Sequence, residues 1–233
     1  MKGTLYGVGV GPGDPELLTL KAVRVIKKCH YIAVPSEDKS KCLAYKIASG
    51  AVELEDKPCL TISMPMTMDA EILEQYHTDG ARKIAGALKQ GKDVAFLVLG
   101  DPAIYATYGY IHEKIKALGY ETQIISGIPS FCAAAARLNI PLVEQAQQLH
   151  ILPAAYAPKE TANLSGIKVF MKIGSKMEWL REQIDTTADH VYMVENCGLE
   201  NERVSYTADG LDEAAGYYSI VIVKNGEHDG YAG

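Results

Sequence analysis

Glycine is concentrated at the start of the chain, in and after one short apolar segment. Residues 5–10 read LYGVGV, and glycines stand at positions 3, 7, 9, 11 and 13 of the 233 residues. Glycines directly after a strand allow a tight turn and a close approach of backbone or ligand. Asp14 and Pro15 follow, with the chemistry of an N-cap and of a first helical residue. The opening therefore predicts a strand, a tight loop and a helix that begins after Asp14.

Strands and helices alternate through the first half of the chain. The tripeptide Gly-Asp-Pro at 13–15 occurs again at 100–102, each time directly after an apolar segment. This alternation is typical of an α/β domain with a mostly parallel sheet. Besides the opening unit, we expect strands at 30–34, 94–99 and 122–125, and helices near 69–90, 108–118 and 133–136.

The pattern changes near residue 145. From there strands dominate, and they are expected at 150–152, 168–173, 190–195, 203–206 and 217–224, with one helix near 175–184. We therefore predict an α/β chain of two domains. An N-terminal domain over 1–145 carries the mostly parallel sheet, and an α+β domain with a mixed sheet over 146–233 completes a cleft.

Three loops follow strands of the N-terminal domain, at 11–14, 100–105 and 127–130. Because the carboxyl ends of parallel strands share one edge, we expect these loops to form one ligand site. For any single loop, the alternative that Gly-Pro and Asp-Pro only make turns and caps stays open. Loops that offer carboxylate and carbonyl oxygens suit a ligand with a positive charge or with hydroxyl and amine donors.

The glycine spacing differs from known nucleotide fingerprints. Pro12 and Asp14 stand where a dinucleotide-binding fingerprint has its third glycine, although Glu37 and Asp38 follow the second strand. A non-catalytic nucleotide-binding module therefore stays an alternative. The chain contains neither the Gly-Lys-Ser/Thr of a P-loop nor a Gly-x-Ser-x-Gly, so it lacks the signatures of P-loop enzymes and of hydrolases with a nucleophile elbow.

Composition narrows the classes of partner. The formal net charge is −6 and basic residues are scattered, which disfavours nucleic acid. No apolar run approaches membrane-spanning length and no secretory signal is visible, so we expect no membrane association. Five cysteines without a Cys-x-x-Cys pair favour reduced thiols in the cytoplasm and no protein-bound metal. The six histidines are isolated from one another and identify no catalytic base.

Three motifs match a known family. The segments YGVGVGPGDPELLTLK at 6–21, FLVLGDPAIYAT at 96–107 and SGIPSFCAAAARL at 126–138 together resemble the tetrapyrrole methylases. These enzymes methylate precorrins and cobalt-factors with S-adenosyl-L-methionine. Four shorter segments are most similar to the branch that methylates C20 of precorrin-2 or cobalt-factor II, at 32–35, 64–66, 132–136 and 151–153.

This resemblance implies an S-adenosyl-L-methionine-dependent C-methyltransferase of cobalamin biosynthesis, a small-molecule tetrapyrrole substrate and a homodimer. A methylase for another corrin carbon, or for a non-tetrapyrrole acceptor, stays an alternative. The resemblance also implies that the methyl donor lies in the cleft between the two domains. The implied contacts are Pro12 in the first loop, Leu99, Gly100, Asp101 and Ile104 in the second, Pro129 and Ser130 in the third, and Met171 and Cys197 at strand ends of the second domain. It assigns no catalytic base.

Overall fold

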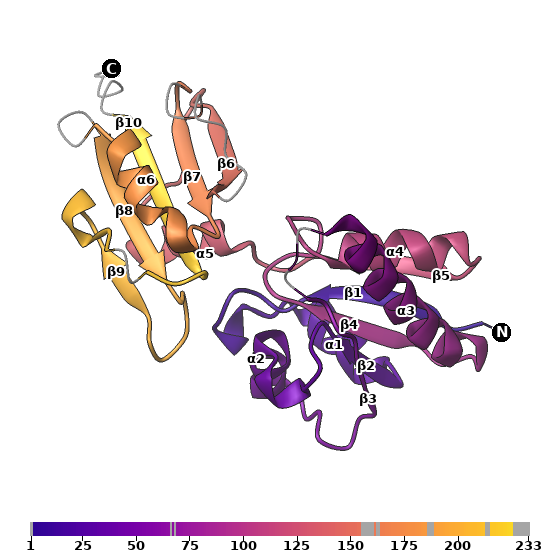
Figure 1. Cartoon of the computed structure of the whole chain (residues 1–233). Coiled ribbons are helices and arrows are strands. Elements are labelled where there is room, and N and C mark those ends of the chain that lie inside the picture. Colours follow the sequence, from indigo (N-terminus) through magenta and orange to yellow (C-terminus); the bar gives the residue numbers. More distant parts are fainter. Residues whose placement is uncertain are drawn as a thin grey trace. The chain divides into compact units, whose positions relative to one another are not determined.

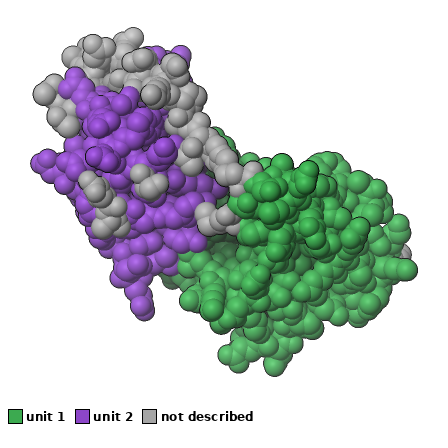
Figure 2. Space-filling view, in the orientation of Figure 1, with its two compact units in different colours: residues 1–129 green, residues 130–233 purple. Residues whose placement is uncertain are grey.

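The chain folds into two compact units, residues 1–129 and 130–233 (Figure 2). The computed structural model describes residues 2–65, 67, 69–154, 161, 164–185, 189–212 and 215–225. Met66, which belongs to one segment of the family resemblance, lies outside the described residues. The division falls before the helix α5 (Ser130–Leu138), earlier than the boundary expected near 145. The reason is that α5 contacts strands β8 and β10 of the second unit.

Unit 1 is a five-stranded parallel sheet with helices on both faces (Figure 1). The strand order is β3-β2-β4-β1-β5, and every paired strand runs parallel to its neighbour. The strands are β1 (Thr4–Gly9), β2 (Tyr31–Val34), β3 (Cys59–Thr61), β4 (Val94–Val98) and β5 (Glu121–Ile125). The α-helices are α1 (Leu20–Lys28), α2 (Leu43–Ala51), α3 (Ala70–Lys89) and α4 (Tyr108–Ala117), with 3₁₀ turns η1 (Pro15–Leu17) and η2 (Lys39–Lys41).

The central strand β4 shows why its sequence is apolar without interruption. Phe96 and Val98 pack into the core under α3 and α4, whereas Ala95 and Leu97 pack into the core under α1 and α2. Successive side chains of a strand point to opposite faces, so a strand covered on both sides buries every residue. The predicted parallel α/β architecture is confirmed.

Three local features of unit 1 differ from the sequence expectation. Asp14 does act as a cap, but its Oδ1 accepts from the Glu16 amide (2.8 Å) and stabilises only the 3₁₀ turn η1. The chain then extends, and α1 begins at Leu20 with Thr19 as its N-cap. The helix α2 and the three-residue strand β3 were not predicted; β3 is defined by its pairing with β2 rather than by its own sequence.

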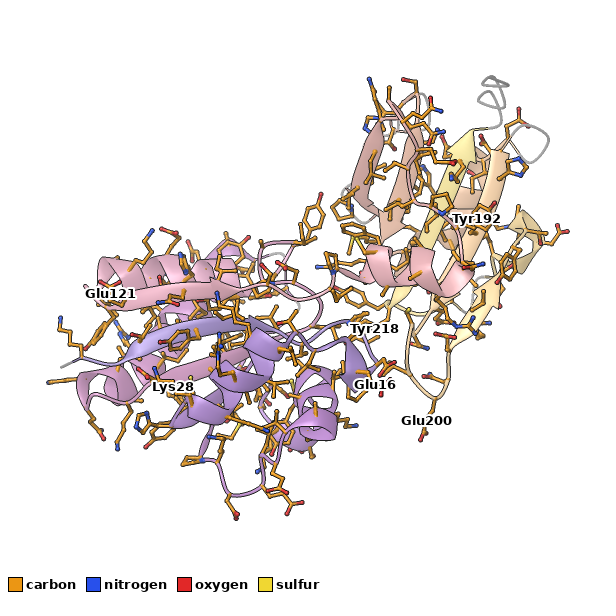
Figure 3. The ribbon with its side chains drawn as sticks, turned by 180° about the vertical axis from the view of Figure 1, so that it is seen from behind. Glu16, Lys28, Glu121, Tyr192, Glu200 and Tyr218 are labelled. Carbon is orange, nitrogen blue, oxygen red and sulfur yellow. The ribbon has the colours of Figure 1, made fainter. Side chains whose placement is uncertain are left out.

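Unit 2 is built on a mixed five-stranded sheet of order β6-β7-β10-β8-β9, in which only β6 and β7 pair in parallel. The helices α5 and α6 lie on opposite faces of this sheet (Figures 1 and 3). The strands are β6 (Leu149–Pro153), β7 (Ile167–Met171), β8 (Asp189–Glu195), β9 (Arg203–Ser205) and β10 (Ser219–Asn225). The other elements are α6 (Met177–Gln183) and the 3₁₀ turns η5 (Gly174–Lys176) and η6 (Ala208–Gly210). The expected mixed sheet is confirmed.

In the described part of the chain, no helix combines the length and the apolar character that crossing a bilayer requires.

Candidate functional site

The three predicted loops lie at one edge of the unit 1 sheet, because β4, β1 and β5 are neighbours and run parallel. The connection after β1 leads to α1 on one face, whereas the connection after β4 leads to α4 on the other face. In open α/β sheets a crevice forms where neighbouring connections diverge in this way, outside the carboxyl ends of the strands. The topology therefore places a candidate ligand site over β1 and β4.

The first and second loops are joined backbone to backbone. The Gly11 amide donates to the Gly100 carbonyl (3.3 Å), and the Gly100 amide donates to the Gly11 carbonyl (2.9 Å). Both glycines have positive φ, +75° and +71°, a conformation that is costly for other residues. This two-way antiparallel bridge joins the first and second loops just beyond the ends of the parallel strands β1 and β4.

The third loop packs so closely against the other two that side chains are excluded. A Cβ built on Gly127 would lie 2.2 Å from the Gly100 carbonyl oxygen and 2.8 Å from the Gly9 Cα. A Cβ built on Gly9 would lie 2.6 Å from the Gly127 nitrogen. Gly9, Gly100 and Gly127 therefore meet at one point, and two of the early glycines (Gly9 and Gly11) bring the loops together.

Asp101 fastens the second loop to the third. Its side chain is buried, Oδ1 accepts from the Ala103 amide (2.7 Å), and Oδ2 accepts from the Gly127 amide (2.9 Å). Because both carboxylate oxygens bind backbone N–H groups, the structure gives this residue a positioning role. Its predicted contact with the methyl donor stays a prediction.

The other predicted residues of unit 1 lie in the same loops. Pro12 is buried, whereas Leu99, Ile104 and Pro129 are half-buried. The six predicted residues from Pro12 to Pro129 therefore share one edge of the sheet. Ser130, the seventh, is the first residue of α5 and belongs to unit 2.

Met171 and Cys197 lie at one edge of the unit 2 sheet. Both β7 and β8 run antiparallel to β10 and are therefore parallel to each other, so their carboxyl ends share an edge. The loop that carries Cys197 is anchored on both sides. The Asn196 amide donates to the Tyr218 carbonyl (3.2 Å), and the Gly198 amide donates to Glu202 Oε2 (2.8 Å).

Thr19 is a positioning residue that the sequence analysis did not identify. Its Oγ1 accepts from the Ala22 amide (3.1 Å) at the start of α1 and donates to the Ser126 carbonyl (3.4 Å) in the third loop. The available signal was a threonine three residues before Ala22, the usual N-cap spacing. The Asp-Pro pair at Asp14 is the stronger N-cap signal, and it places the predicted start of the helix five residues too early.

The donor set of the loops indicates which ligand charge they accept. Neither Lys nor Arg occurs in residues 9–19, 98–113 or 125–136. Within the described ranges, no three His, Cys, Asp or Glu residues gather closely enough to hold a metal ion. An edge made of backbone groups, apolar side chains and the bound carboxylates of Asp14 and Asp101 favours a neutral or cationic ligand over an anion.

A profile of the Tetrapyrrole (Corrin/Porphyrin) Methylases matches residues 4–211. The chain belongs to this family. This tetrapyrrole methylase is 36% identical, over 94% of its length and 95% of the relative's, to a probable cobalt-precorrin-2 C(20)-methyltransferase of Methanocaldococcus jannaschii. It is 27% identical, over 95% of each chain, to a precorrin-2 C(20)-methyltransferase of Sinorhizobium sp..

A solved structure supports the fold of this tetrapyrrole methylase. The uroporphyrin-III C-methyl transferase of Thermus thermophilus, complexed with S-adenyl homocysteine, superposes with a TM-score of 0.68. The two sequences are 19% identical, and the match covers 95% of this chain and 97% of that one. The family resemblance read from the three motifs is confirmed.

Proposed function

We propose that this tetrapyrrole methylase transfers a methyl group from S-adenosyl-L-methionine to C20 of precorrin-2, or of its cobalt-containing counterpart, in cobalamin biosynthesis. The observation that carries the proposal is the similarity, along nearly the whole chain, to a probable cobalt-precorrin-2 C(20)-methyltransferase. The precorrin-2 relative, aligned over an equally large share, supports the same position of methylation.

We infer that S-adenosyl-L-methionine binds at the carboxyl edge of the unit 1 sheet. The residues that would hold it there are Pro12, Leu99, Gly100, Ile104 and Pro129, with Asp101 fixing the loops around them. The fit is chemical, because the donor carries a positive sulfonium and these loops offer oxygens and apolar surface without a cation. On the family resemblance, we propose three further contacts of the donor: Ser130, Met171 and Cys197.

The chemistry assigned to the chain is mainly orientation. When bound, the donor supplies a methyl group already activated on sulfur, and the acceptor carbon of a reduced tetrapyrrole is electron-rich. The protein has to hold carbon, methyl and sulfur in line and keep water out. S-adenosylhomocysteine leaves as the methyl group bonds to the acceptor carbon, and a base then takes the proton from that carbon. Such positioning can contribute about 7–11 kcal/mol to lowering a barrier in favourable cases.

Two measurements test the proposal. Calorimetry should show binding of S-adenosylhomocysteine; no binding would contradict an S-adenosyl-L-methionine-dependent enzyme. Incubation with ¹³C-methyl donor and either precorrin-2 or cobalt-factor II, followed by NMR, should place the label on C20. A label on another carbon would make the chain a methylase of a different step, and comparing the two acceptors decides whether cobalt is already present in the substrate.

We also propose a homodimer in the cytoplasm. The five cysteines, all within the described residues, form no disulfide, as expected of a reducing compartment. Sedimentation at micromolar concentration should give a species of twice the 25.3 kDa chain mass. A monomer under these conditions would contradict the dimer.

A further inference from the structure

The loop between β8 and β9 carries one of the proposed contacts of the methyl donor, Cys197. Residues 196–202 connect these two antiparallel strands. Two backbone bonds fold the loop into successive turns: the Leu199 amide donates to the Asn196 carbonyl (2.9 Å), and the Glu202 amide donates to the Leu199 carbonyl (3.1 Å). The loop therefore has a defined course between the two strands.

Glu202 uses its two carboxylate oxygens for two different partners. Oε2 accepts from the Gly198 amide (2.8 Å), next to Cys197, and Oε1 forms an ion pair with Nε of Arg137 in the last turn of α5. The Glu202 side chain is only 16% exposed, so water competes little for these bonds. Figure 3 shows Glu200 at the tip of the same loop. One carboxylate thus ties the loop to a helix of the same unit.

The helix α5 brings a second proposed contact into the same arrangement. Its first residue is Ser130, and Arg137 follows about two helical turns later. The helix contacts β8 and β10, so it is fixed on the sheet that carries the loop. Ser130 and Cys197 are therefore linked through Arg137 and Glu202, which are not themselves among the proposed contacts of the donor.

The conformation of this loop depends on the bonds that hold it. Asn196 has a φ of +53°, and Gly198 has a φ of +78°. The left-handed region is less favourable for asparagine than for glycine, and it persists where surrounding bonds fix it. Without the charge of Glu202, the link to α5 is lost and the loop gains alternative conformations. A donor then has to order the loop as it binds, which weakens its affinity.

We propose that Glu202 and Arg137 are positioning residues for the methyl donor: together they hold the loop that carries Cys197 in the conformation that binds S-adenosyl-L-methionine. The inference rests on the proposed function and deepens it. Both side chains act through the loop and through α5 rather than by touching the donor. The bonds that they organise are the same before and during methyl transfer, so their loss lowers the affinity for the donor and leaves turnover at saturating donor nearly unchanged.

The test breaks this link from both sides, with Glu202→Gln, Arg137→Gln and the double variant. Arg137→Lys keeps the positive charge. The matched control is Glu144→Gln, because Oε2 of Glu144 lies 3.8 Å from Nζ of Lys224, in an ion pair of the same unit near the amino end of β8. Urea unfolding establishes that each variant is folded. Calorimetry gives the Kd for S-adenosylhomocysteine, and initial rates with precorrin-2 give kcat at saturating donor.

We expect Glu202→Gln and Arg137→Gln each to raise the Kd for S-adenosylhomocysteine about fivefold, the effect of losing one charge-assisted bond. The double variant should bind about as well as either single variant, because both substitutions break the same link. Arg137→Lys should keep the Kd within about twofold of wild type, since the charge remains. Glu144→Gln should leave the Kd unchanged, and kcat at saturating donor should stay within about twofold in every variant.

Two results would overturn this inference alone. A Kd for Glu202→Gln equal to that of Glu144→Gln would assign the link to the stability of the fold, whatever the urea midpoint. Losses of affinity that add up in the double variant would show that Glu202 and Arg137 act separately. A wild-type chain that neither binds S-adenosylhomocysteine nor methylates a tetrapyrrole would overturn the proposed function, and this inference with it.

Discussion

The substitution Asp101→Asn tests how the three loops are held together. The two carboxylate oxygens accept separately from the amides of Ala103 and Gly127, and the side chain is only 9% exposed. Asparagine has one acceptor oxygen, and its NH₂ group is a donor. In either orientation of the amide, one of the two backbone N–H groups faces a donor. Leaving a buried polar group unsatisfied costs about 1–3 kcal/mol, so we expect Asp101→Asn to lower the free energy of unfolding by an amount near the middle of that range.

Asp69→Asn is the matched control. At the start of α3, Asp69 uses a single oxygen, Oδ1, to accept from both the Glu71 amide (2.9 Å) and the Ile72 amide (3.1 Å). Asparagine can keep both of these bonds with its carbonyl oxygen. The variant loses only a negative charge at a helix N-terminus, worth about 0.3–1 kcal/mol. The difference between the two variants in the free energy of unfolding therefore measures the contribution of the second acceptor oxygen of Asp101.

Urea unfolding of both variants and calorimetry with S-adenosylhomocysteine provide the comparison. We expect Asp101→Asn to unfold at lower urea than Asp69→Asn with a similar m-value. It should also bind S-adenosylhomocysteine more weakly, because the third loop loses its tie to the second. Equal unfolding midpoints would refute the two-oxygen clamp. A normal midpoint with weakened binding would instead indicate that the carboxylate acts on the ligand directly.

Three further predictions concern packing and protonation. Gly127→Ala should lower the melting temperature, because a Cβ 2.2 Å from the Gly100 carbonyl oxygen displaces the backbone at a cost of about 1–3 kcal/mol. Gly86→Ala in α3, where nothing lies within 4 Å of the new Cβ, should raise the melting temperature. Changes of the same sign in the two variants would contradict the close approach at Gly127. Burial raises the pKa of Cys29 to about 12, so at pH 8 this buried residue is almost entirely in the unreactive thiol form. A disulfide reagent should therefore modify the exposed Cys132 before Cys29. A fast phase of modification that survives Cys132→Ser would argue against this order. Burial lowers the pKa of His77 below its ordinary 6.5, so the folded state favours the neutral imidazole. The contribution of His77 to the stability of the fold is therefore complete above pH 6.5 and falls as the pH drops below it. In melting curves between about pH 7.5 and 5.5, His77→Gln should weaken this pH dependence.

Several elements could be predicted from local chemistry. The apolar run of β4 and the amphipathic pattern of α3, which begins after Asp69, appear in the structure almost where the sequence placed them. The start of α1 could not be predicted, because Asp14 and Thr19 both have capping chemistry and only the packed chain shows which one caps the α-helix. The strand β3 has three half-buried residues and exists through its pairing with β2.

By itself, the sequence determined the α/β class, the family and the three loops that follow β1, β4 and β5, since these depend on periodicity and on short motifs. Tertiary structure decided what the residues of those loops do. Gly9 and Gly127 are needed because two backbones cross there, and Asp101 binds amides that lie 2 and 26 residues away in the chain. It also brought Lys172 and Tyr217 together across the ends of β7 and β10. Such contacts join residues far apart in the chain, so no local pattern records them.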